Sequence, residues 1–190
     1  MGYHGDHGFA TNSHRIGIEP TCPRWYHGRM QRHLLVMRHC KSSWDHPSLS
    51  DHQRPLNQRG MRDAPKVGGK LRALGLIPDC VVSSDSRRTT MSWEEMLPAL
   101  EAHCEPCFTR ELYHAGAEDL RRVIGRQDPP FATLLVLGHN PGWEYFASWL
   151  AGARHTMTTG NVAIFTADTR TWAIEPSDWT LQHWIRPREL

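Results

Sequence analysis

Two histidines and three arginines in this sequence have the types and positions that phosphoryl-transfer chemistry requires. Arg38 and His39 directly follow a short apolar run, and Arg54 lies in the polar segment after it. Arg88 and His139 come just after two later runs of the same kind. A neutral imidazole can attack phosphorus, and guanidinium groups neutralise the oxygens of a phosphoryl group. The pattern therefore predicts transfer of a phosphoryl group to a histidine without help from a metal ion.

Each of these residues also has a plainer interpretation. Arg54 and Arg88 could be solvated surface arginines, and His139 could simply cap the end of a strand. Arg87 competes with Arg88 for the same place, although the spacing from the preceding serine pair favours Arg88. The hypothesis of a site therefore depends on a fold that brings these residues together.

From residue 33 onward, short apolar runs alternate with longer amphipathic stretches, which predicts strands alternating with helices. This rhythm predicts right-handed crossovers and a mostly parallel sheet covered on both faces, a three-layer α/β/α sandwich. The predicted strands are His33–Met37, Cys80–Ser83, Thr133–Leu137, Val162–Thr166, Thr171–Glu175 and Leu181–Ile185, and the predicted helices are Asn57–Leu74, Ser86–His103, Ala117–Arg126 and Pro141–Leu150.

The carboxyl ends of parallel strands meet at one edge of a sheet, where α/β proteins bind their ligands. We therefore expect the arginines and histidines that follow the strands to converge there. The last three predicted strands have no helices between them and are expected to pair antiparallel. Pro65 and the pair Gly68-Gly69 are expected to break or kink the first helix.

The length of 190 residues predicts one domain, which we place over residues 32–190. Residues 1–31 lack apolar periodicity and are expected to form a poorly ordered extension. Their four histidines lack the spacing of a defined metal site. A net charge of +2 gives no argument for nucleic-acid binding. Without a long apolar run or a signal peptide, we expect a cytoplasmic protein that binds no membrane.

The five cysteines favour reduced thiols over a disulfide framework, since no secretory signal accompanies them. Cys104 and Cys107 form a CxxC pair, but a zinc site would need a second pair and the other cysteines stand singly. The sequence also contains no P-loop and no glycine-rich dinucleotide turn. We therefore expect neither a metal ion nor a cofactor.

The chain resembles the histidine phosphatase superfamily (phosphoglycerate mutase-like, branch 1), and within it the small phosphohistidine phosphatases of the SixA type. The resemblance covers residues 33–190, and five blocks carry it in order. One such block alone is weak, whereas five in order are specific. The blocks are Leu35–Trp44, Arg54–Gly60, Ser83–Arg88, Leu112–Ala115 and Leu137–Gly142, and the ending Ile185–Leu190 also fits.

This resemblance implies that His39 is the nucleophile and becomes transiently phosphorylated. It further implies that the phosphoryl group is held by Arg38, Arg54, Arg88, His139 and Asn140. Larger relatives use a glutamate as general acid, and Glu111 is the matching candidate. Its neighbours Glu118, Asp119 and Tyr113 could instead cap or pack against the next helix. A phosphoramidate has a good leaving group, so phosphohistidine would need less help from an acid.

The segment between Leu112 and Thr133 is too short for the capping insertion of larger superfamily members. We therefore expect an open pocket, suited to a phosphohistidine side chain on a protein, and inorganic phosphate as product. The alternatives are a phosphomonoesterase acting on a small metabolite and a non-catalytic module that binds phosphate. Cys40 replaces the small residue common after Arg-His, and we expect either mild oxidant sensitivity through its thiol or a compact filler of that space.

Overall fold

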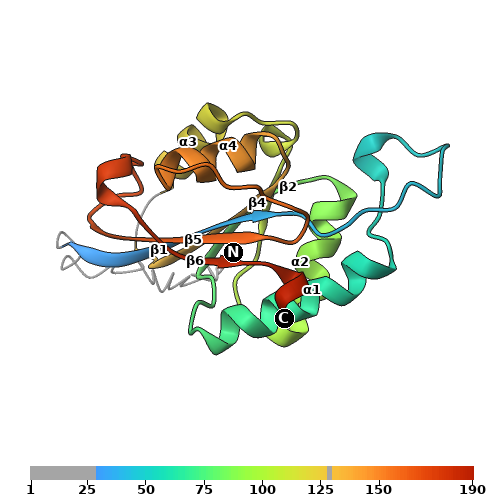
Figure 1. Ribbon diagram of the computed structural model, residues 1–190, viewed down its shortest axis with the longest axis horizontal. Helices are drawn as coiled ribbons and strands as arrows, with labels where there is room; N and C mark the ends of the chain where they lie inside the picture. The colour runs from blue at the N-terminus through green and yellow to red at the C-terminus, as the bar shows by residue number, and fades with distance from the viewer. Residues whose placement is uncertain (1–28, 128–129) are drawn as a thin grey trace, which may run out of the picture.

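A six-stranded sheet runs through the centre of the protein, with helices on both of its faces (Figure 1). The computed structural model describes residues 29–127 and 130–190. In sheet order β3-β2-β4-β1-β5-β6, the strands are β3 (Cys107–Thr109), β2 (Cys80–Ser84), β4 (Thr133–Gly138), β1 (Met30–Arg38), β5 (Val162–Thr169) and β6 (Thr180–Ile185). The helices are α1 (Gln58–Ala73), α2 (Arg87–Leu100), α3 (Ala117–Gly125) and α4 (Gly142–Leu150), and short 3-10 turns form η1 (Asp51–Gln53), η2 (Arg110–Leu112), η3 (Pro176–Asp178) and η4 (Pro187–Glu189).

The first four strands in the chain run parallel to one another, and the last two run antiparallel at one edge. β1 pairs parallel with β4, β4 with β2, and β2 with β3. β5 pairs antiparallel with β1, and β6 with β5. The predicted three-layer α/β/α sandwich with a mostly parallel sheet is therefore confirmed. The carboxyl ends of β1, β2 and β4 lie at the same edge of the sheet.

The sheet separates two apolar cores, and β1 contributes to both. Leu34 and Val36 pack on the side of α3 and α4, whereas Leu35 and Met37 pack on the side of α1 and α2. All four side chains are fully buried, which explains why the sequence shows a continuous apolar run rather than an alternating pattern. Because the strand is covered on both faces, its carboxyl end has a fixed position.

Two strand predictions differ from the structure. The segment Thr171–Glu175 is irregular and forms no strand. Its buried residue Trp172 stacks between Phe131 and Trp179, and the apolar side chains of the segment cover the core. The strand β3 was not predicted, because three residues that are partly or largely exposed carry no readable pattern.

We expected Pro65 and the glycine pair to break or kink α1. The expected break is wrong, since the helix runs from Gln58 to Ala73 as one element. Packing explains its continuity, because the face that contains Gly68 lies against α2. A Cβ atom at Gly68 would stand 2.5 Å from the backbone oxygen of Met96, so glycine is needed for this close approach. Tertiary contact here outweighs the low helix propensity of the local sequence.

The predicted extension over residues 1–31 lies mostly outside the described residues, and so does Cys22. The strand β1 begins at Met30, three residues earlier than expected, since Met30 and Gln31 pair with β5. Among the described helices, none has the length and apolar composition needed to cross a membrane.

The contact between α1 and α2 gives a matched pair of predictions. Gly68→Ala should destabilise the protein by about 1–3 kcal/mol, because the added methyl group meets the backbone of α2. Gly69→Ala should be neutral or stabilise by up to about 1 kcal/mol, because nothing lies within 4 Å of its Cβ position. Urea unfolding of both variants measures the difference, and equal midpoints would contradict the packing argument.

Candidate functional site

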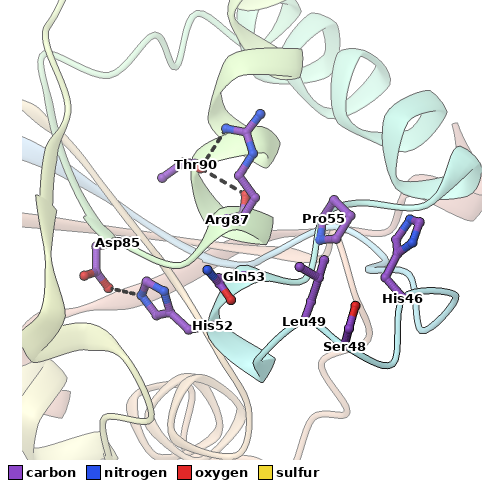
Figure 2. A pocket seen from close by; sticks show the side chains of 9 residues that line it. All are labelled: His46, Ser48, Leu49, His52, Gln53, Pro55, Asp85, Arg87 and Thr90. Atoms are coloured by element: carbon purple, nitrogen blue, oxygen red, sulfur yellow. Dashed lines mark hydrogen bonds and ion pairs between the residues drawn. The ribbon is translucent and has the colours of Figure 1, made fainter.

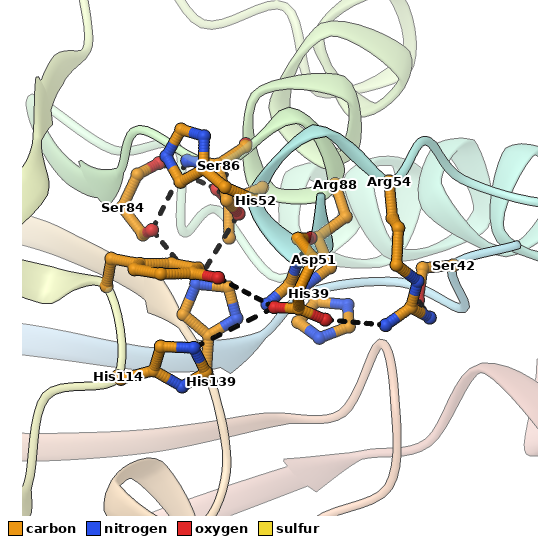
Figure 3. A network of polar contacts seen from close by, with 12 residues as sticks. His39, Ser42, Asp51, His52, Arg54, Ser84, Ser86, Arg88, His114 and His139 are labelled. Carbon is orange, nitrogen blue, oxygen red and sulfur yellow. Dashed lines mark hydrogen bonds and ion pairs between the residues drawn. The ribbon is translucent and has the colours of Figure 1, made fainter. Parts of the chain in front are cut away.

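Five side chains predicted from the sequence meet beyond the carboxyl ends of β1, β2 and β4, and Figure 3 shows four of them, His39, Arg54, Arg88 and His139. His39 follows β1 and His139 follows β4, and their ring centroids are 5.2 Å apart. Arg88 enters from the first turn of α2, and Arg54 from the loop after η1. Each of these four side chains belongs to a residue that is less than 10% exposed. Arg38, the last residue of β1, lies beside them and donates from Nη1 to the carbonyl of Met157 at 2.7 Å.

His39 is held in one orientation with one nitrogen free. The Nδ1 atom lies 2.6 Å from the carbonyl oxygen of Cys40, which can only accept a hydrogen bond, so Nδ1 carries the proton. The Nε2 atom therefore presents a lone pair. Burial and, to a smaller extent, the charges of Arg88, Arg38 and Arg54 outweigh the opposing effect of the Cys40 carbonyl, and together they lower the pKa of His39 to about 3. The ring is neutral at physiological pH, as a nucleophile must be.

His139 is also kept neutral, and it retains an unused polar atom. Its Nε2 atom is hydrogen-bonded to the Ser84 hydroxyl at 2.9 Å and lies 3.4 Å from the Ser86 hydroxyl. Burial lowers the pKa of His139 to about 2, and the nearby His39 and Arg88 act in the same direction. Within the described residues, Nδ1 of His139 and Nε of Arg38 are buried without a hydrogen-bond partner. Such atoms are available to a bound anion.

The carboxylate of Asp51, which the sequence did not single out, links the two buried arginines. Nη1 of Arg54 donates to Oδ1 at 2.7 Å, and Nη2 of Arg88 donates to Oδ2 at 3.0 Å. The Tyr113 hydroxyl also donates to Oδ2, at 2.8 Å. Partial burial raises the pKa of the Asp51 carboxyl, but these hydrogen bonds and the charge of Arg88 bring it well below its ordinary value. The arginine pair already holds one anionic group.

Several predicted residues are not brought into this cluster. The carboxylate of Glu111 accepts a hydrogen bond from Arg126 at 3.0 Å and pairs with Arg122, so it faces α3 rather than the histidines. Arg87 points to solvent and pairs with Glu94 at 3.2 Å, which agrees with the choice of Arg88. The amide of Asn140 donates to Glu144 and to the Met157 carbonyl, at the rim of the site.

The structure revises the expectation for Cys40 in favour of a compact filler. The residue is fully buried, and its backbone N–H donates to the Ser92 hydroxyl at 2.9 Å. Burial raises the pKa of the Cys40 thiol to about 12, so the reactive thiolate is suppressed. Cys107, by contrast, is exposed.

A pocket of about 570 Å³ opens beside the cluster (Figure 2). The imidazole of His52 forms its wall toward the cluster, since Nε2 donates to Asp85 at 2.7 Å and the ring packs edge-on against Tyr113. The pocket therefore adjoins the cluster, but neither His39 nor His139 lines it. It is lined by His46, Ser48, Leu49, His52, Gln53, Pro55, Asp85, Arg87 and Thr90.

Comparisons with known proteins agree with one another. The family model of the histidine phosphatase superfamily (branch 1) matches residues 34–130. An uncharacterized chloroplastic protein of Arabidopsis thaliana is 36% identical over 172 residues, which cover 83% of this chain and 79% of that protein. An uncharacterized protein of Mycobacterium tuberculosis is 33% identical over 120 residues, covering 63% of this chain and 73% of the relative.

Solved structures show the same fold. A Nakamurella multipartitia protein that carries the SixA name superimposes with a TM-score of 0.71 at 24% identity, covering 84% of this chain and 98% of its own. The protein histidine phosphatase SixA complexed with tungstate gives a TM-score of 0.67 at 23% identity, covering 84% and 99%. At these identities the likeness concerns the fold alone.

Burial of Cys40 gives a prediction for thiol chemistry. Iodoacetamide at neutral pH should label the exposed Cys107 in the native protein and should leave Cys40 unlabelled until the chain is unfolded in urea. Peptide mass mapping before and after unfolding measures both sites. Rapid native labelling of Cys40 would show that its thiol is reached by solvent.

The lowered pKa of His39 predicts how stability depends on pH. Below about pH 6.5 the unfolded chain binds a proton at this residue, while the folded protein does not until about pH 3. Stability is therefore lost as the pH falls, by up to about 1.4 kcal/mol per pH unit for this group. His39→Asn should flatten the dependence between pH 7 and pH 5, measured by urea unfolding. His183→Asn, at an exposed residue of β6, is the control, and equal slopes in both variants would contradict this account.

Proposed function

Because the chain belongs to the histidine phosphatase superfamily (branch 1), we propose that it is a phosphohistidine phosphatase that acts on phosphorylated proteins through a covalent intermediate on His39. One observation carries this proposal. The Nδ1–H of His39 is committed to the Cys40 carbonyl, so the Nε2 lone pair is directed away from the backbone and lies among buried cations.

The chemistry has two steps. Nε2 of His39 attacks the phosphorus atom, and the bond from phosphorus to the substrate nitrogen breaks as the leaving imidazole takes a proton. Water then attacks phosphorus, the bond to Nε2 breaks, and phosphate leaves with His39 restored. Arg38, Arg54 and Arg88 are placed to neutralise the phosphoryl oxygens in both transition states, and the unpartnered Nδ1 of His139 can donate to one of them.

Two features favour a protein substrate over a metabolite. Among the described residues between Leu112 and β4, the short helix α3 is the one helix, and it packs beside α4 on one face of the sheet (Figure 1). The site is therefore open. The pocket next to His52 offers room for residues that flank the phosphorylated side chain. A cytoplasmic location stays a prediction, and the Arabidopsis thaliana relative is described as chloroplastic.

Phosphate release from a histidine-phosphorylated protein tests the proposal. Wild-type protein should release phosphate, also in the presence of a chelator, and His39→Asn should lose about 10³-fold or more of kcat/KM because the nucleophile is absent. Quenching wild-type turnover in alkali should trap phosphohistidine on residue 39, identified by peptide mapping. His183→Asn again serves as the control, since it changes a histidine on the sheet edge.

The same assay separates the alternatives. Turnover of sugar phosphates or nucleotides without turnover of phosphohistidine would replace the proposal with a metabolite phosphatase. Phosphate binding without turnover of any ester or phosphoramidate would leave only a binding module. Loss of activity in the chelator would indicate a metal-assisted reaction and would contradict the arginine-based mechanism.

A further inference from the structure

We propose that His114 is the proton donor to the leaving group of the reaction. This inference rests on the proposed function and names the acid that the mechanism needs, since Glu111 faces α3. His114 lies at the mouth of the site, on the segment between η2 and α3. Its ring centroid is 6.2 Å from that of His139, and Figure 3 shows the two imidazoles on the same side of the Asp51 carboxylate.

The backbone holds His114 in a conformation that a histidine seldom adopts. Its φ angle is +58°, in the left-handed region that is strained for a residue with a Cβ atom. The surrounding structure maintains this conformation. The ring of Tyr113 contacts that of His114, with 4.1 Å between the ring centroids. The next residue, Ala115, packs tightly against Gly142, because a Cβ atom on residue 142 would stand 2.1 Å from the carbonyl oxygen of Ala115. The imidazole is therefore aimed at the site.

The imidazole of His114 stands beside an anionic group without being hydrogen-bonded to it. Its Nε2 atom lies 3.8 Å from Oδ2 of the Asp51 carboxylate, beyond hydrogen-bond distance. The ring forms no hydrogen bond to another described residue, and its side chain is exposed, so it can reach a substrate. The other titratable groups that face it are Tyr113 and the neutral His139.

Neither neighbour is a better donor. Burial and the hydrogen bond to Asp51 raise the pKa of Tyr113, so its phenol holds the proton more tightly than an ordinary tyrosine. His139 is uncharged because burial lowers its pKa. The side chain of His114, at 64% exposed, can also exchange protons with solvent between turnovers. Of these three residues, His114 is the one that lies at the site with an exposed side chain.

The proton balance closes over the two steps. As Nε2 of His39 attacks phosphorus, the breaking bond leaves an electron pair on the departing nitrogen or oxygen, which takes a proton from the His114 imidazolium. The neutral His114 then accepts a proton from the water that attacks phospho-His39. After phosphate leaves, both histidines have regained their starting protonation states.

The dependence on leaving group tests this assignment. His114→Asn removes the acid while keeping a residue that tolerates the left-handed backbone. The kcat/KM for phenyl phosphate should fall by about 10²-fold, because phenolate is a poor leaving group and needs a proton. The kcat/KM for 2,4-dinitrophenyl phosphate should change by less than about threefold, because dinitrophenolate leaves without a proton.

Glu111→Gln is the matched control, because it alters the other acid candidate, whose carboxylate is turned toward Arg126. We expect it to keep the wild-type ratio between the two esters. An equal loss with both esters in His114→Asn, or a selective loss in Glu111→Gln, would overturn the role of His114 and leave the proposed function standing. Absence of turnover by the wild-type protein with both esters and with phosphohistidine would overturn the proposed function together with this inference.

Discussion

The in-register parallel pairing of β1 with β4 is the constraint on which the site depends. Arg38 stands opposite Gly138 in the ladder, and the N–H of His39 donates to the Gly138 carbonyl at 3.0 Å. The two strands therefore end together, and the residues that follow them, His39 and His139, meet in space although 100 positions separate them in the chain. A shift of one residue would turn every buried side chain of β1 to the opposite core, so the same packing that stabilises the sheet fixes the distance between the histidines.

Burial creates the electrostatic character of the site. Two arginines and two histidines lie together out of water, which favours neutral imidazoles and leaves the guanidinium charges in need of an anion. Asp51 supplies part of that charge, and it connects the arginines to Tyr113 and His114. For the function we propose, this arrangement is in place for a doubly charged phosphoryl group before any substrate binds, which is the preorganisation that stabilises charged transition states.

The two apolar cores lie on the faces of the sheet, away from the edge that carries the candidate site. The helices α1 and α2 cover one face of the sheet and α3 and α4 the other, while the loop with η1 extends from the edge at the carboxyl ends of β1 and β4 (Figure 1). The strands β1 and β4 position His39 and His139 at their carboxyl ends. The loop with η1 and the segment around Tyr113 contribute the groups that surround these histidines, and Leu112 and Ala115, on either side of Tyr113, anchor that segment in the core.

The sequence by itself determined the alternation of strands and helices and the residues that gather at the strand ends, because apolar periodicity and the geometry of parallel sheets are local rules. It could not reveal the role of Asp51, which meets Arg88 and Tyr113 across 37 and 62 positions, nor that Glu111 turns away while His114 turns in. It also misjudged α1 and the segment around Trp172, where packing against distant residues outweighs local propensity. Only tertiary structure decides such points, because the direction of a side chain in a loop depends on partners that are distant in the chain and that no local pattern encodes.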